Sequence, residues 1–126
     1  MKEILFRGYN KKIEGDHFIY GETVLYQEHR NQWVMLVETE LGEQWVDIDE
    51  PQPYIGADDI KGKKIFEGDL LQWIEGGTPN KTPHYVLYDP HLMHFVLAPN
   101  KELMYTKTII CPEWYEVIGN IYDEHK

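Results

Sequence analysis

Alternation of apolar and polar side chains with a period of two residues constrains the fold of this chain more than any other feature. Val46 and Ile48 alternate with Asp47 and Asp49, and residues 4–7 and 32–38 read as further extended stretches whose side chains fall on two faces with the same period. Successive side chains of an extended backbone point to opposite faces, so this period predicts β-strands. Turn signals separate the stretches at intervals of about 8–12 residues. We therefore predict an all-β fold, a small barrel-like or SH3-like domain of about nine or ten short strands with little helix.

The apolar pattern also predicts how two of these strands are buried. Residues 32–38 carry apolar side chains on both faces, which is typical of a central strand. The strand that follows is half-buried, with Val46 and Ile48 pointing inward and Asp47 and Asp49 facing water.

Helix is expected only in short pieces. Residues 103–110 are the best candidate for a longer helix, but their threonines and isoleucines are β-branched and lose rotamer freedom in a helix. Asp58 and Asp59 are predicted to cap a single helical turn that ends at Gly62.

Two glycine motifs are interpreted as structural. Residues 63–73 read as a strand, a tight turn and a second strand, and the turn needs a glycine where φ is positive. The aspartate after that glycine is expected to accept a backbone N–H and hold the turn closed. A second glycine lies where the last strand must bend or bulge. The predicted turn motif comprises Glu67, Gly68, Asp69, Gly119 and Asn120.

Three separated blocks carry a resemblance that spans nearly the whole chain. They are residues 2–8, then residues 54–56 followed by 62–71, and finally residues 116–122. In this order they resemble the YopX family, small proteins encoded mainly by phages and prophages of Gram-positive bacteria. Residues 57–59 depart from the family pattern, where leucine is more common. The resemblance implies a phage-derived or prophage-derived accessory protein and names no reaction.

Length and composition indicate a single cytoplasmic domain, and the resemblance implies that this cytoplasm is that of a host bacterial cell. The 126 residues fit one domain, which we predict over residues 1–126. The only cysteine, Cys111, has no internal partner for a disulfide, as expected in a reducing compartment. The first apolar run is too short for a signal peptide, and no run approaches the roughly 20 residues of a membrane helix. We therefore expect no membrane partner.

The charge balance argues against nucleic acid as a partner. The chain has 22 acidic and 12 basic residues, a formal net charge of -10, which repels phosphate backbones. Dense basic pairs such as Lys11–Lys12 are interpreted as turn lysines. The densest acidic run, residues 38–50, is interpreted as a solvated face or an acidic interaction surface. An acidic mimic of DNA, or a nucleic-acid-associated protein, stays an alternative.

Three histidines raise a second alternative, a metal-dependent enzyme. His84, His91 and His94 lie close in sequence, and imidazole is a common metal ligand. A hairpin that pairs Tyr88 with Met93 would place His84 and His94 on opposite faces and His91 in the turn. We therefore interpret them as surface histidines and expect no metal site.

Other catalytic chemistry finds little support in the sequence. The chain contains no serine, which excludes serine hydrolase chemistry. Cys111 has no basic residue close in sequence to lower its pKa. Gly76 and Gly77 are followed by Thr78 and Pro79, so they do not form a phosphate-binding loop. We expect no catalytic residue and no cofactor.

The remaining interpretation is a non-catalytic protein–protein interaction module. Among four tryptophans and nine tyrosines, those left exposed would mark a contact surface. An aromatic and acidic surface fits a protein partner, from host or phage, better than DNA, and a homo-oligomer is a further expectation. The predicted interaction surface comprises Trp45, Asp47, Asp49 and Trp73.

Overall fold

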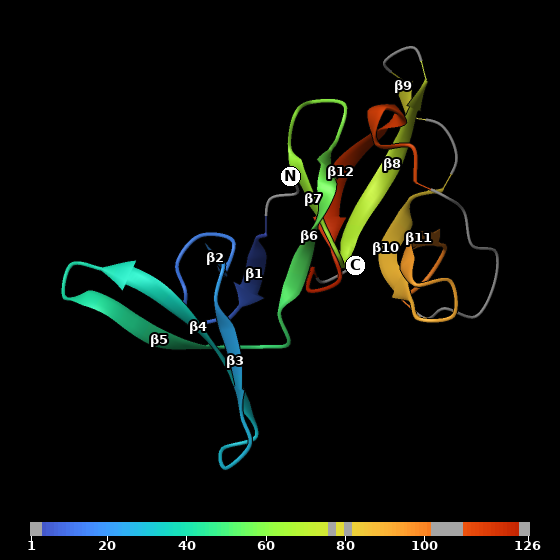
Figure 1. Cartoon of the computed structure of the whole chain (residues 1–126). Helices are drawn as coiled ribbons and strands as arrows, with labels where there is room; N and C mark the ends of the chain where they lie inside the picture. The colour runs from blue at the N-terminus through green and yellow to red at the C-terminus, as the bar shows by residue number, and fades with distance from the viewer. Residues whose placement is uncertain (1–3, 76–77, 80–81, 102–109, 124–126) are drawn as a thin grey trace. The chain divides into compact units, whose positions relative to one another are not determined.

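The computed structural model describes residues 4–75, 78–79, 82–101 and 110–123, and the chain divides into two compact units (Figure 1). Unit 1 spans residues 1–54 and unit 2 spans residues 55–126. The expectation of one domain over the full chain stays a prediction. The described residues contain no helix that is long and apolar enough to span a bilayer.

Unit 1 is built from short antiparallel strands. β1 (Phe6–Tyr9) pairs with β2 (Phe18–Gly21) on one side and with the first residues of β6 (Gln52–Asp58) on the other. A three-stranded sheet follows in the order β3-β4-β5. Its strands are β3 (Val24–Gln27), β4 (Gln32–Thr39) and β5 (Gly42–Ile48).

One face of the three-stranded sheet packs inside unit 1. Met35 and Ile48 are fully buried on this face. A Cβ on Gly8 of β1 would lie 2.4 Å from Ile48, and one on Gly21 of β2 would lie 3.1 Å from Met35. Only glycine permits such close approach of β1 to the sheet, so these two strands cover the inward face.

Unit 2 contains the five-stranded antiparallel sheet and its own core. β6 continues into this unit beside β7 (Lys64–Phe66). The larger sheet has the order β11-β10-β8-β12, with β9 paired to β8. Ile65, Leu71, Val86 and Leu97 form the buried cluster. The elements are β8 (Asp69–Glu75), β9 (Thr78–Pro79), β10 (His84–Asp89), β11 (His94–Ala98), the 3-10 turn η1 (Pro112–Trp114) and β12 (Tyr115–Asn120).

The two glycine motifs lie side by side in unit 2. Gly68 has a φ of 90°, and the Asp69 carboxylate accepts the Phe66 N–H at 2.8 Å. The β8–β12 ladder shifts register between residues 117 and 119, and Asn120 pairs with Asp69. A Cβ on Gly119 would lie 2.5 Å from the Asp123 carboxylate, so a larger residue at this position would displace that side chain.

The structure confirms the all-β class and shows open sheets, not a closed barrel. Each sheet of the described residues has a linear strand order, whereas closure would require its two outer strands to pair. The prediction of a central strand over residues 32–38 is confirmed by β4. Val46 and Ile48 are more buried than Asp47 and Asp49, as predicted.

The two expectations about helix are not confirmed by the structure. The predicted helical turn after Asp58 is wrong, because Asp58 ends β6 and residues 59–62 form a turn. The Asp59 carboxylate accepts the backbone N–H groups of Lys61 and Lys63 and so closes that turn without a helix. Residues 103–110, apart from the last, lie outside the described residues.

Candidate functional site

The outward face of the three-stranded sheet in unit 1 carries the residues that can contact a partner. The β4–β5 register sets Leu36 opposite Trp45 and Val34 opposite Asp47. Paired residues of an antiparallel ladder share one face, and alternate residues follow them there. We call this side of β4 and β5 the Trp45 face. It consists of Val34, Leu36, Glu38, Glu43, Trp45 and Asp47, and all of these except the fully buried Val34 are accessible to a partner.

An aromatic and aliphatic pair forms the centre of the Trp45 face. Trp45 is 47% exposed, although it stands on a strand whose other side packs in the core. Leu36, directly opposite, is partly buried, and Val34 is fully buried. A half-exposed tryptophan beside aliphatic side chains is the type of anchor that is enriched in protein interfaces.

Two carboxylates meet at the next rung of the ladder. Glu38 lies directly opposite Glu43, and both are exposed. Like charges in this arrangement destabilise an antiparallel pair. Within the described part of the chain, neither carboxylate has an ion pair. The Trp45 face therefore carries a concentrated negative charge that a cationic group would neutralise.

The third carboxylate of the Trp45 face is held by an arginine. The Arg30 guanidinium lies 2.7 Å from an Asp47 carboxylate oxygen and also donates to the Gln27 side chain at 2.8 Å. This contact joins β5 to the end of β3. Because both charges are largely exposed, we assign it an orienting role and little stability.

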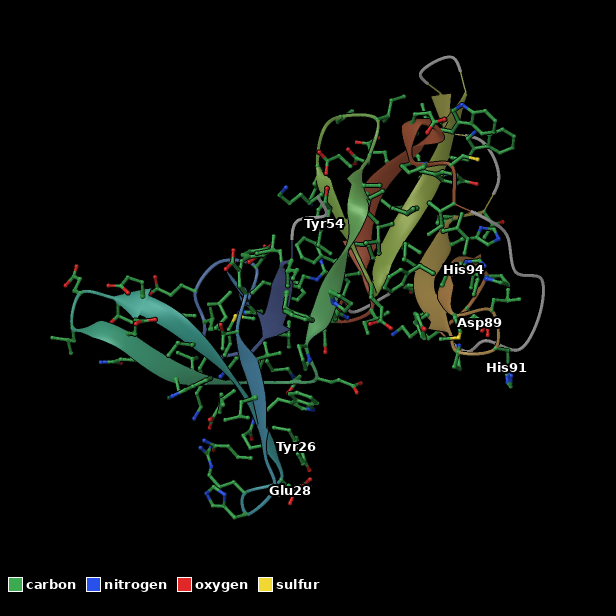
Figure 2. The ribbon with its side chains drawn as sticks, in the orientation of Figure 1. Tyr26, Glu28, Tyr54, Asp89, His91 and His94 are labelled. Atoms are coloured by element: carbon green, nitrogen blue, oxygen red, sulfur yellow. The ribbon has the colours of Figure 1, made fainter. Side chains whose placement is uncertain are left out.

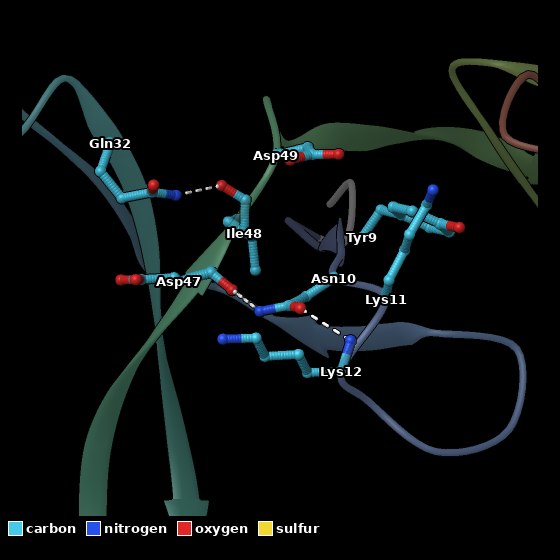
Figure 3. Close-up of a pocket in the computed structure, with 8 residues that line it drawn as sticks. All are labelled: Tyr9, Asn10, Lys11, Lys12, Gln32, Asp47, Ile48 and Asp49. Atoms are coloured by element: carbon cyan, nitrogen blue, oxygen red, sulfur yellow. Dashed lines mark hydrogen bonds between the residues drawn. The ribbon is translucent and has the colours of Figure 1, made fainter.

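A surface pocket of about 420 Å³ opens at the end of β5 (Figure 3). Asn10 holds its wall, donating its side-chain N–H to the Asp47 carbonyl at 2.8 Å and accepting the Lys12 N–H at 2.9 Å. Gln32 donates to the Ile48 carbonyl at 2.8 Å. The lining residues are Tyr9, Asn10, Lys11, Lys12, Gln32, Asp47, Ile48 and Asp49.

This pocket is chemically a mixed-charge surface. Two lysines and two aspartates line it, and all four are exposed. Among the residues that line it in the described part of the chain, none is a histidine, serine or cysteine. A solvated set of this kind can contact polar groups, but it provides no nucleophile with an adjacent base.

The structure brings three of the four predicted surface residues together in unit 1. Trp45 and Asp47 share the Trp45 face, and Asp49 lines the adjoining pocket. Trp73 belongs to unit 2, where its ring stacks on Trp114 with centroids 6.5 Å apart. Trp73 is thus part of a separate aromatic pair on β8 and η1.

The three histidines of unit 2 occupy different positions on one hairpin. The predicted pairing of Tyr88 with Met93 is wrong, because Asp89 pairs with His94 (Figure 2). Met93 takes a φ of 56° and donates its N–H to the Asp89 carbonyl, which moves the loop one residue along. The register moves by two residues in total, so His84 and His94 still face opposite sides.

The surroundings of the histidines are also described by the structure. The His91 N–H donates to the Asp89 carboxylate at 2.9 Å, which ties this histidine to the turn through its backbone. Within the described ranges, no group of three or more histidine, cysteine or acidic side chains is arranged to hold a metal ion.

Among the described residues of unit 2, Tyr115 has a perturbed pKa. Burial raises the pKa of the Tyr115 phenol above its ordinary value of 10.0, and Cys111 raises it further. Tyr115 therefore stays protonated at neutral pH. It supports the core as a neutral aromatic ring, since it packs against the buried cluster.

Sequence reasoning missed the opposition of Glu38 and Glu43. Both belong to the acidic run, but their meeting depends on the two-residue turn between Thr39 and Gly42. Thr39 donates its hydroxyl to the Gly42 carbonyl at 2.7 Å, and Gly42 has a φ of 96°. A threonine followed three residues later by glycine between alternating runs was the available signal.

These observations define a small antiparallel all-β protein with an exposed aromatic and acidic face. The family described as YopX protein matches residues 5–126. Because this match covers nearly the whole chain, the protein belongs to the YopX family. A comparison with curated proteins gave no match.

Proposed function

We propose that this YopX family member is a non-catalytic accessory protein that binds a protein partner through the Trp45 face. As the family resemblance implies, the proposal places it among phage-derived or prophage-derived proteins acting in the cytoplasm of a bacterial host. The partner segment that fits this face is basic, with lysine or arginine beside an apolar residue.

The observation that carries the proposal is the Glu38–Glu43 rung beside exposed Trp45. In the isolated chain these two carboxylates repel each other, and neither forms an ion pair within the described residues. A basic partner would remove the repulsion and bury the indole in the same contact. Charged borders around an apolar centre are the usual anatomy of a protein interface.

The pocket supports a binding role for this region over a catalytic one. Its lysines and aspartates are solvated. Such charges can attract and orient a binding partner, but they are poorly suited to proton transfer. The Asn10 side chain links the backbone of Asp47 to that of Lys12 on the pocket wall through two hydrogen bonds. A preorganised surface loses less conformational entropy when a partner binds.

The test is affinity capture from a Gram-positive bacterial lysate with the full chain as bait. Trp45→Ala is expected to weaken retention of a captured protein by roughly thirtyfold, since truncating a central tryptophan costs about 2 kcal/mol or more. Glu38→Gln with Glu43→Gln should also release it. Trp114→Ala is the control, because Trp114 is 52% exposed but lies in unit 2.

Three results would contradict the proposal. They are a bait that retains nothing, retention that survives Trp45→Ala, and equal loss with Trp114→Ala. Retention that disappears after nuclease treatment would instead support the nucleic-acid-associated alternative.

A further inference from the structure

The two edges of the three-stranded sheet in unit 1 differ in how they are protected. At the β5 edge, Asp49 donates its N–H to the Tyr9 carbonyl at 2.9 Å, and Asn10 donates to the Asp47 carbonyl at 2.8 Å. β5 also carries the acidic residue Glu43. Backbone capping and charge are the usual means of blocking an edge strand.

The β3 edge has neither kind of protection. β3 reads Val-Leu-Tyr-Gln, without a charge, proline or glycine. In the described part of the chain it pairs with β4 alone. An uncharged strand of high β-propensity with one open edge is a template for a further strand.

The hydrogen-bond pattern shows which groups of β3 point away from the sheet. The Leu36 N–H donates to the Thr23 carbonyl at 3.0 Å, so residue 23 bonds toward β4. In an antiparallel ladder this direction alternates, and residues 25 and 27 bond toward β4 as well. The N–H and C=O groups of Val24 and Tyr26 therefore point outward at the open edge.

We infer that β3 pairs with β3 of a second copy of this chain, antiparallel, about a twofold axis at Leu25. In this register Val24 bonds to Tyr26 of the partner subunit, and Tyr26 to Val24 of the partner subunit. Each of these rungs exchanges two backbone hydrogen bonds. The outward groups of β3 are thereby all used, and Leu25 faces Leu25 of the partner subunit.

Side-chain chemistry favours a second copy as the occupant. Leu25 is 48% exposed and Tyr26 is 38% exposed. At the non-hydrogen-bonded central rung the two leucines approach to about 4.5–5.5 Å between Cβ atoms, where they cover each other. A strand without charge meets its own copy without repulsion, although each whole chain has a net charge of -10.

Charges at both ends of β3 limit the pairing to this short segment. Glu28 follows the strand at the tip of the β3–β4 hairpin, near Tyr26 (Figure 2). In the proposed register Glu28 faces Glu22 of the partner subunit. Their repulsion stops the ladder at residues 23–27 and favours a closed dimer over an extended fibre.

The decisive experiment is sedimentation velocity of the full chain over a concentration series. The unaltered protein should show a monomer–dimer equilibrium. Leu25→Lys should weaken the dimer by at least about a hundredfold, because two lysines would meet at the axis. Trp45→Lys is the matched control: it makes the same charge change at similar exposure on the other edge strand, and it should leave the dimer unchanged.

Mixing two variants tests the register. Leu25→Lys and Leu25→Glu should each be monomeric alone, and an equimolar mixture should form a heterodimer in native mass spectrometry. Far-ultraviolet circular dichroism verifies the fold of each variant. Trp45→Lys removes the anchor of the Trp45 face but leaves β3 unchanged. Loss of binding to the proposed partner can therefore be distinguished from loss of the dimer.

Hydrogen exchange tests the proposed β3–β3 pairing in the unaltered chain, without any substitution. The amides of Val24 and Tyr26 should exchange more slowly at high protein concentration than at low concentration. The inference is overturned by a strict monomer, by equal exchange of these amides at both concentrations, or by a dimer that Leu25→Lys leaves intact. Equal weakening by Trp45→Lys, or a variant mixture that stays monomeric, also overturns it.

Discussion

At the residue scale, unit 2 relies on a buried carboxylate that sequence reasoning assigned to a helix cap. Asp59 is only 6% exposed, and its carboxylate accepts three backbone N–H groups. Lys61 and Lys63 belong to its own turn, whereas Val117 belongs to β12 at 2.8 Å. One side chain thus closes a local turn and attaches it to a strand 58 residues away.

We predict that Asp59→Ala lowers the free energy of unfolding by about 3–5 kcal/mol, because it leaves three backbone donors without their acceptor. Asp59→Asn should cost less, since its oxygen still accepts the two bonds of the turn and only the Val117 bond is lost. Urea denaturation measures both, and Asp49→Ala is an exposed control. Equal stability of Asp59→Ala and Asp49→Ala would contradict this role for Asp59.

At the scale of elements, turn geometry determines which side chains meet. The turn between Thr39 and Gly42 sets the β4–β5 register and so places Glu38 opposite Glu43. In the β10–β11 hairpin, the positive φ of Met93 moves the four-residue loop one residue along the chain and pairs Asp89 with His94. Alternation in the sequence predicted the strands of both hairpins but not the register, because several loop lengths and loop positions satisfy the same alternation.

Most substitutions lower the free energy of unfolding, but one substitution at the Glu38–Glu43 rung is predicted to raise it. Glu38→Lys should raise the free energy of unfolding by about 0.2–1 kcal/mol, because it replaces a cross-strand repulsion by an attraction. Urea denaturation at low salt measures the gain, and added salt should reduce it. Glu40→Lys is the control, with the same charge change in the exposed turn. A gain for Glu40→Lys as large as that for Glu38→Lys would argue against the rung.

At the scale of the whole molecule, net charge acts on every association of the chain. Two copies that each carry a net charge of -10 repel at long range, although the β3 edge is neutral. A basic partner is attracted to the same protein. The two proposed contacts therefore differ in the sign of their response to ionic strength.

We predict that raising NaCl from about 0.05 to 0.5 M strengthens the β3-mediated dimer and weakens retention of the partner, because screening shortens the reach of both forces. Sedimentation and affinity capture in the same buffers measure the two effects. Partner retention that increases with salt would indicate an apolar contact without the acidic border, and a dimer weakened by salt would indicate ionic bonds between copies.

Local sequence was sufficient to predict an all-β chain, the buried central strand over residues 32–38 and the outward position of Trp45 beside Asp47. Alternation and glycine at turns express the conformational preferences of single residues and their immediate neighbours. The open sheets, the Glu38–Glu43 rung, the unprotected β3 edge and the Asp59–Val117 bond came from the folded chain. Each depends on the register or packing between segments that are separate in sequence, and many such arrangements satisfy the same local pattern.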